Sequence, residues 1–167
     1  MKNTLWIFLA LFISAAAHGQ QDCPCCTDAH RQFDFWLGDW TVYDTTGKQI
    51  GENTIVSQED GCLLAEHWRG AGGTTGRSIN FVDRADGSWN QVWIDNQGNK
   101  LVLKGEGSPG KMVMRSTVTK HPRSGKDFYN QISWTAQEDG SVIQQWDLIF
   151  EADQEMRTVF KGIYRKE

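Results

Sequence analysis

Turn residues recur at short intervals from Trp40 to the C-terminus, and this spacing restricts the fold more than any other feature of the chain. The turns are rich in Gly, Asn and Asp, which tolerate left-handed backbone conformations, as in Thr46-Gly47, Asp86-Gly87 and Asp139-Gly140. The connections between the turns are too short to hold crossover helices, so successive strands should pair in an antiparallel manner. The sequence therefore predicts an all-β meander.

Ten strand candidates lie between these turns. They span Trp40–Tyr43, Ile50–Gln58, Leu63–Arg69, Thr75–Asp83, Ser88–Asp95, Lys100–Glu106, Lys111–Thr119, Phe128–Ala136, Val142–Phe150 and Met156–Arg165. A meander of this length leaves two exposed edges unless the sheet closes on itself, and closure removes both. We therefore expect an antiparallel up-and-down closed barrel of about ten strands. A two-sheet sandwich is the alternative.

The first twenty residues have the features of a secretory signal peptide. Lys2 gives a positive start, an apolar run extends from Leu5 to Ala17, and the run ends in small alanines. An uncleaved N-terminal anchor is the alternative. We expect a signal peptide over 1–20, a Cys-rich leader with a short helical cap over 21–38, and the barrel over 39–167. This organisation predicts a periplasmic or secreted protein with no membrane span after cleavage.

A short helical turn is the one helical element that the sequence predicts. Phe33, Trp36 and Leu37 recur at helical spacing on one face, and Thr27 or Asp28 is a suitable residue to cap the turn. A helix of this length is marginal alone and needs a surface to pack against. We expect it to lie across one end of the barrel.

Two groups of motifs resemble known proteins. The stretch Phe35–Trp40 reads Phe-Trp-Leu-Gly-Asp-Trp, and its Gly-x-Trp resembles the signature of lipocalins and other calycins. Glu66–Gly70 reads Glu-His-Trp-Arg-Gly and, with Gly76–Phe81 and Trp89–Asp95, resembles an uncharacterised bacterial family with a lipocalin-like fold. The resemblance covers nearly the whole mature chain. It implies the fold and no established activity.

The lipocalin resemblance also implies roles for particular residues. Gly38 and Trp40 would be structural, and an arginine from the end of the barrel would stack on the tryptophan, which points to Arg165. The nitrobindin-like haem barrels are relatives by fold and bind iron through a histidine near the C-terminus. The last histidine here is His121, in a turn, so we expect no cofactor.

Pairing across two hairpin turns predicts which side chains share a face. With turns at Gly70–Gly73 and at Asp86-Gly87, one face carries Leu63, Ala65, His67, Arg77, Ile79, Phe81, Trp89, Gln91 and Trp93. We expect this face to line the interior, because large aromatic side chains are costly to expose. A slip of one residue in either hairpin would redistribute these side chains between the two faces. If His67 and Arg77 instead lie on the outside of the barrel, Glu66 and Asn80 become the candidates.

This arrangement predicts an apolar cavity into which His67, Arg77, Gln91 and Trp93 project. Such a cavity suits a small, partly apolar ligand, which would be anionic if Arg77 held a carboxylate. Two alternatives remain. These residues could satisfy one another in a filled barrel, or His67 and Arg77 could serve a calycin-type isomerase or hydrolase. No recognisable catalytic string is present, so no catalytic residue is assigned.

Four cysteines fit an oxidising compartment, where disulfides are allowed. Cys62 begins a strand near a barrel rim that the leader can reach, so we expect it to pair with Cys25 or Cys26. The alternative is that the dense thiolates, with His18 or His30, bind Cu(I) or zinc, although we expect no metal. The formal net charge is -4 and no Lys/Arg cluster is present, which argues against nucleic acid as a partner.

Overall fold

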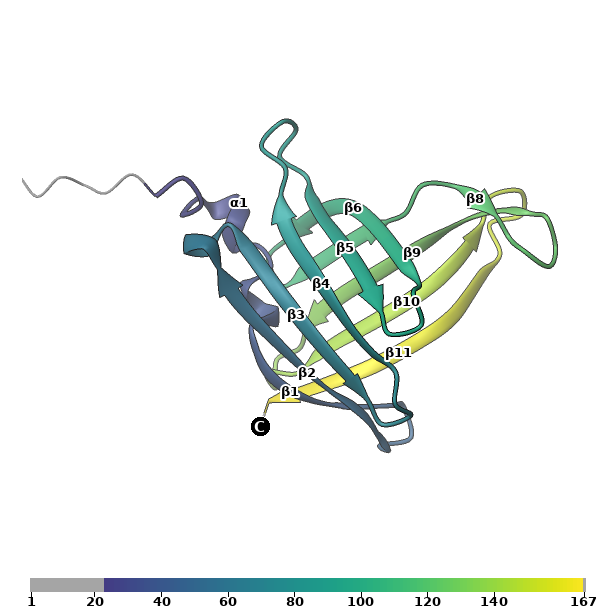
Figure 1. The fold of residues 1–167 in the computed structure, drawn as a ribbon, viewed down its shortest axis with the longest axis horizontal. Coiled ribbons are helices and arrows are strands. Elements are labelled where there is room, and N and C mark those ends of the chain that lie inside the picture. Colours follow the sequence, from purple (N-terminus) through teal and green to yellow (C-terminus); the bar gives the residue numbers. More distant parts are fainter. Residues whose placement is uncertain (1–22, 167) are drawn as a thin grey trace, which may run out of the picture.

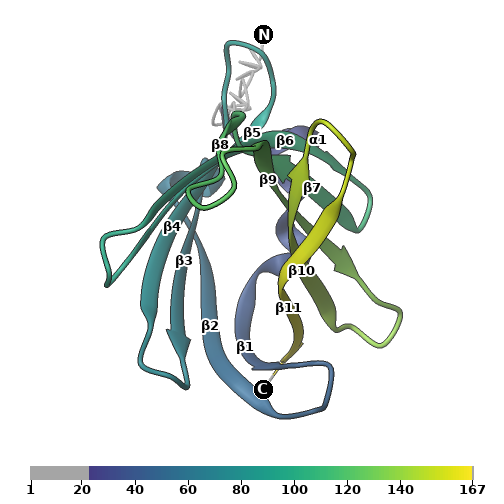
Figure 2. The ribbon, with the colours of Figure 1, turned by 90° about the vertical axis from the view of Figure 1, so that its right-hand side faces the viewer.

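The computed structural model describes residues 23–166 and has an all-β architecture (Figure 1). Ten strands form one closed antiparallel ring, which Figure 2 shows from the end, so the predicted barrel is confirmed. The signal peptide predicted over 1–20 lies outside the described residues. Within 23–166, no helix is long and apolar enough to cross a membrane.

The strands follow the predicted sequence ranges closely. They are β1 Gly38–Tyr43, β2 Gln49–Gln58, β3 Leu63–Gly70, β4 Thr75–Val82, β5 Trp89–Asp95, β6 Lys100–Ser108, β7 Lys111–Arg115, β8 Thr119–Lys120, β9 Asp127–Ala136, β10 Val142–Phe150 and β11 Met156–Lys166. The predicted strand Lys111–Thr119 is divided between β7 and β8. The short β8 pairs only with β9 and lies outside the ring.

The ring closes where the two ends of the barrel sequence meet. β1 pairs with β11, with Trp40 opposite Lys166 and Val42 opposite Tyr164, and β10 pairs with both β9 and β11. Every strand of the ring therefore has a hydrogen-bonded neighbour on each side. No unpaired edge remains in the ring for another chain to extend.

Two short helical pieces close one end of the barrel. They are α1 Asp28–Arg31 and a 3-10 turn over Asp34–Trp36, in place of one continuous turn. Phe33 and Trp36 are fully buried and stack with ring centroids 4.8 Å apart. The Phe33 ring also meets Trp89 and Trp134 edge-on, at 5.6 and 5.1 Å. These aromatic rings fill the end of the barrel where the N-terminal segment packs.

Gly38 marks the entry of the chain into the barrel. Its φ of 128° lies in a region that side chains rarely adopt, which explains the glycine of the Gly-x-Trp motif. Two residues later, the buried Trp40 indole donates a hydrogen bond to the Trp36 carbonyl oxygen at 2.9 Å. The motif thus ties the helical plug to the first strand.

The cation over Trp40 is Lys166, so the expectation that Arg165 stacks there is wrong. The Lys166 Nζ lies 5.2 Å from the centroid of the Trp40 ring, whereas the Arg165 guanidinium lies over Tyr43. The register explains the difference, because β11 places Lys166 opposite Trp40 and Arg165 opposite Thr41. Successive side chains on a strand point to opposite faces.

Two disulfides hold the N-terminal segment. Cys25 pairs with Cys62 across 37 residues, which confirms the predicted long-range bridge, and Cys26 pairs with Cys23. A short 3-10 turn, Glu59–Gly61, brings Cys62 to the rim. All four cysteines are therefore engaged in disulfides, which leaves no thiolate for a metal.

Candidate ligand-binding cavity

The β4–β5 hairpin decides which side chains enter the barrel, and it corrects the predicted face. The Asp83 amide donates to the Ser88 carbonyl oxygen at 2.8 Å, so four residues lie between this hydrogen-bonded pair. Ser78 therefore lies opposite Trp93, and Asn80 opposite Gln91, one residue out of the predicted register. The predicted β3–β4 register holds, with His67 opposite Arg77. Gln91 and Trp93 thus share a face with Glu66 and Asn80.

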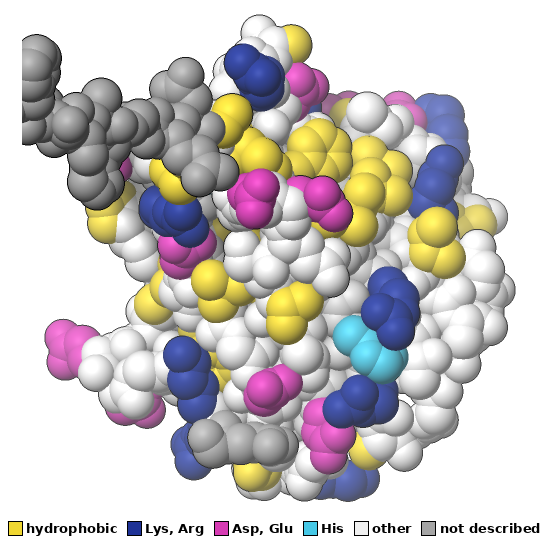
Figure 3. Space-filling view, turned by 60° about the vertical axis from the view of Figure 1, so that its left-hand side comes forward, with side chains coloured by type: hydrophobic (Ala, Val, Ile, Leu, Met, Phe, Trp, Pro, Cys, Tyr) yellow, Lys and Arg dark blue, Asp and Glu magenta, His cyan; other side chains and the backbone are white. Residues whose placement is uncertain are grey.

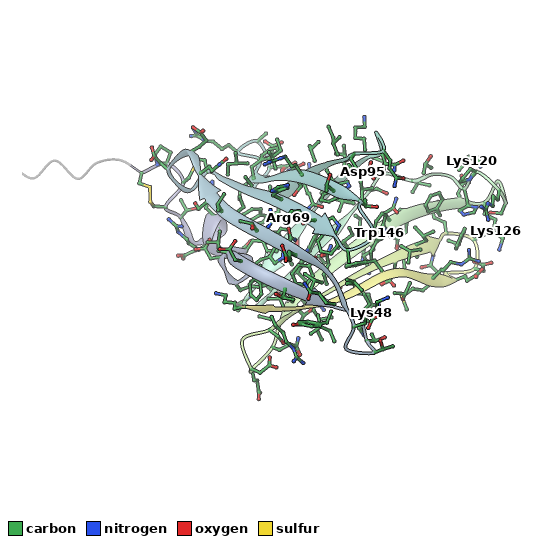
Figure 4. The ribbon with its side chains drawn as sticks, turned by 60° about the horizontal axis from the view of Figure 1, so that its bottom comes forward. Lys48, Arg69, Asp95, Lys120, Lys126 and Trp146 are labelled. Atoms are coloured by element: carbon green, nitrogen blue, oxygen red, sulfur yellow. A yellow bond between two sulfur atoms is a disulfide. The ribbon has the colours of Figure 1, made fainter. Side chains whose placement is uncertain are left out.

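A cavity of about 500 Å³ occupies the half of the barrel away from the helical plug. Its apolar wall consists of Trp68, Trp93, Leu101, Ile132, Trp146 and Phe160. Polar side chains on the wall are Glu66, Gln91, Asn130, Gln144 and Tyr164, and the mouth is formed by Thr74, Asp95, Asn99 and Lys100. Figure 4 shows Asp95 and Trp146 on this side of the barrel. Apolar walls with a few polar groups are typical of a small-molecule site.

Inward-facing glycines leave the space in which the aromatic rings of the cavity wall lie. A Cβ atom added at Gly51 would lie 2.4 Å from the Trp68 indole, and one at Gly76 would lie 2.2 Å from the Trp93 indole. At Gly162, the same atom would lie 2.9 Å from the Phe160 ring. Each ring therefore lies close to the backbone of a neighbouring strand. Glycine within a strand often marks such a close approach.

A hydrogen-bonded network that includes the cavity residues Glu66 and Gln91 crosses four strands. Asn53 Nδ2 donates to Glu66 Oε1 at 2.8 Å, and the Ser78 hydroxyl donates to Glu66 Oε2 at 2.5 Å. Asn80 Nδ2 donates to the Ser78 oxygen at 2.9 Å, and Gln91 Nε2 donates to Asn80 Oδ1 at 2.8 Å. All five side chains are buried. The network holds the Glu66 carboxyl group in one position.

Burial changes the ionisation of the two acidic groups in this part of the cavity. Burial raises the pKa of Glu66 to about 7, against hydrogen bonds from Ser78 and Asn53 that favour the ionised form. Burial and the nearby Glu66 charge raise the pKa of the Tyr164 phenol well above its usual value. The phenol donates a hydrogen bond to Gln144 Oε1. At neutral pH, Tyr164 is therefore neutral and Glu66 changes its charge.

His67 and Arg77 lie on the outer wall, so the prediction that they project into the cavity is wrong. They line a separate shallow depression with Ile79, Val92 and Ile94, which are partly or well exposed. Partial burial and the charges of Arg77 and Arg69 lower the pKa of the His67 imidazole. Figure 3 shows that hydrophobic and charged side chains are interspersed on one outer face of the barrel. The predicted catalytic pairing inside the cavity does not occur.

Several cavity residues were not singled out from the sequence. Tyr164 lies near Glu66, and Trp68, Trp146 and Phe160 supply most of the aromatic wall. The Glu66 partners Asn53 and Ser78, which do not line the cavity, were not singled out either. The sequence of β2 carried a signal for Asn53. Gly51, Asn53 and Ile55 are buried on one face of the strand, whereas Glu52 on the other face is exposed. A polar residue at a core-facing position of a strand is a candidate binding residue.

Comparison with known proteins leaves the geometry as the guide to function. No protein-family model matches this chain, and no curated protein matches it by sequence. Among the described residues, no group of three or more His, Cys, Asp or Glu side chains is arranged to hold a metal ion.

Proposed function

We propose that this protein is an exported, lipocalin-like binding protein that holds a small, partly apolar molecule in the barrel cavity. The single observation that carries the proposal is the cavity of about 500 Å³, which has an aromatic wall, a buried hydrogen-bonding network and an open mouth. Ligand pockets of about 300–1,000 Å³ bury most of a small organic molecule.

The arrangement of the barrel supports binding rather than a merely filled core. One end is packed by the plug residues Phe33 and Trp36, whereas the other half places indole and phenyl side chains around the cavity. The glycines at 51, 76 and 162 let the Trp68, Trp93 and Phe160 rings lie close to the backbone of the wall, which leaves the cavity between them open. A closed ring of strands keeps such walls in fixed positions.

Export agrees with the two disulfides. Cystine bridges persist in the periplasm and outside the cell and are rare in the cytosol of most organisms. A protein that carries a small molecule in such a compartment needs a stable fold, and the Cys25–Cys62 bridge fixes the plug against the barrel rim.

Titration with the neutral fluorophore N-phenyl-1-naphthylamine tests the proposal. We expect one molecule to bind per chain, with quenching of the tryptophan fluorescence. Leu101→Trp should weaken binding about tenfold or more by filling the cavity, whereas His67→Ala should not change it, because His67 lines the outer depression. The reverse pattern, or no saturable binding, would contradict a cavity site.

A further inference from the structure

We propose that the ligand is an organic ammonium ion, with its charged nitrogen at the Glu66 carboxylate and its apolar body among the aromatic side chains of the cavity. This inference rests on the proposed function, since it names the chemical class that the same cavity takes. It also replaces the expectation of an anionic ligand, which depended on Arg77 projecting inward.

The charged side chains that line the cavity lie at different depths. Glu66 is buried, with 5% of its surface exposed, whereas Lys100 is exposed at the mouth. Asp95 also lies at the mouth, and its carboxylate accepts hydrogen bonds from Gln97 and Asn99 within the β5–β6 turn. Among the described residues that line the cavity, the inner part therefore holds one carboxylate and no basic side chain. Its charge favours a cation.

The Glu66 carboxylate has free capacity to accept hydrogen bonds. Each oxygen accepts one hydrogen bond, from Asn53 and from Ser78, although an ionised carboxylate offers about four acceptor positions. Both donors are neutral, so the buried charge has no counter-charge among its hydrogen-bond partners. A ligand ammonium group would supply that charge and offset much of the cost of burying the carboxylate.

A second acceptor lies beside the carboxylate. The Asn53 side chain is 1% exposed, and its Oδ1 has no hydrogen-bond partner even though the atom is buried. The Nδ2 of the same amide donates to Glu66, so the unpaired oxygen belongs to a side chain that contacts the carboxylate directly. The surroundings of Glu66 thus offer acceptors and no positive charge. An ammonium group, which carries up to three donors, can hydrogen-bond to the Glu66 carboxylate on the cavity wall, whereas a ligand carboxylate cannot.

The aromatic wall suits the same ligand. Trp68 and Phe160 meet edge-on with ring centroids 6.1 Å apart, and Asn130 accepts a hydrogen bond from the Trp146 indole at 2.9 Å. These contacts fix the rings, whose π faces attract cations and repel anions. Trp68 is two residues nearer the β3–β4 turn than Glu66 on the same strand, a step of about 7 Å. An aromatic group joined to an amine by a short alkyl chain fits that spacing.

Three probes with one carbon skeleton test the inference in the full chain. They are 2-(2-naphthyl)ethylamine, 2-(2-naphthyl)ethanol and 2-naphthylacetate, measured by isothermal titration calorimetry at pH 8. We expect the amine to bind at least about tenfold more tightly than the alcohol, and the carboxylate to bind more weakly than both. Equal or tighter binding of the alcohol or the carboxylate would overturn the ammonium inference and leave the binding function standing. Binding of none of the three would contradict both.

The pH dependence of amine binding, together with a Glu66 variant, tests whether Glu66 supplies the negative charge. The side chains that face Glu66 are Asn53 from β2, Ser78 from β4 and Tyr164 from β11, and none of them changes charge between pH 5 and pH 8. The affinity for the amine should therefore rise at least about tenfold over this range as Glu66 loses its proton, while the affinity for the alcohol stays constant.

In Glu66→Gln, the preference for the amine and its pH dependence should both disappear. The matched control Glu52→Gln, which removes an exposed carboxylate paired with Arg69 outside the cavity, should change neither. An amine preference that survives in a folded Glu66→Gln protein would refute the proposal. If that variant does not fold, the pH dependence in the unaltered protein decides, because a pH-independent preference would refute it equally.

Discussion

The Lys166 ammonium group lies 5.2 Å from the centroid of the Trp40 ring, where the last strand of the barrel meets the first. The same pair is in register across the β1–β11 seam, and Trp40 is 1% exposed. The contact therefore joins the two ends of the barrel sequence at the position where the ring closes.

Removal of the Lys166 charge should weaken this seam. We expect Lys166→Met, which keeps much of the apolar stem, to lower the free energy of unfolding by about 0.5–1 kcal/mol through loss of the cation–π contact. Urea unfolding followed by tryptophan fluorescence measures the change. Lys161→Met alters an exposed lysine on the same strand and should change stability by less than about 0.5 kcal/mol. Equal effects of the two changes would show that the contact contributes nothing.

The two disulfides should contribute unequally to stability. In the chain-entropy model, the Cys25–Cys62 bridge, which closes a span of 37 residues, stabilises the fold by about 4 kcal/mol. The Cys23–Cys26 bridge spans three residues and should contribute about half as much or less. Thermal unfolding of Cys25→Ser/Cys62→Ser and Cys23→Ser/Cys26→Ser double variants compares them. A larger loss from the short-range pair would contradict the entropic account.

The architecture could be predicted from the sequence because its signals are local. Turn residues such as Asp86-Gly87 end each strand, and the short connections between strands permit only antiparallel neighbours. A long-range bridge from Cys62 followed from the same topology, since the helical cap and the start of β3 meet at one rim, although the sequence left its partner open between Cys25 and Cys26.

The cavity could not be predicted with the same certainty because it depends on a single residue of register. The loop between Asp83 and Ser88 has four residues, and a loop one residue shorter would turn the opposite face of β5 inward. Both faces of β3 carry apolar side chains, with Ala65 on one and Leu64 and Trp68 on the other, so hydrophobicity did not decide between them. A one-residue difference at the C-terminus had the same effect, because Lys166 lies over Trp40 where Arg165 was expected.

Burial of Glu66 should make stability fall as the pH rises. Its folded-state pKa is raised from 4.5 to about 7, so the folded protein holds this proton more tightly than the unfolded chain does. The resulting stabilisation is fully present below pH 4.5 and is lost as the pH rises through 7. The loss amounts to about 3 kcal/mol by proton linkage.

A comparison with Glu66→Gln isolates this effect from all other titrating groups. We expect the variant to gain stability relative to the unaltered protein between pH 4.5 and pH 8, by up to about 3 kcal/mol. Urea unfolding of both proteins at several pH values measures the difference. A stability difference that does not vary with pH would show that Glu66 titrates normally in the folded barrel.

The shape of the cavity depends on the absence of a side chain at Gly76. A Cβ atom at this position would lie 2.2 Å from the Trp93 indole, so Gly76→Ala must displace the ring from the β4 backbone. We expect a loss of about 1–3 kcal/mol in unfolding free energy, as is typical of overpacking. Uptake of N-phenyl-1-naphthylamine should also weaken, because the displaced indole moves into the cavity. Gly72→Ala is the matched control in the turn before the same strand, where an added Cβ meets nothing within 4 Å, and it should leave both measurements unchanged. If Gly76→Ala keeps the stability and the uptake of the unaltered protein, the Trp93 ring does not lie against β4 and the described wall of the cavity is incorrect.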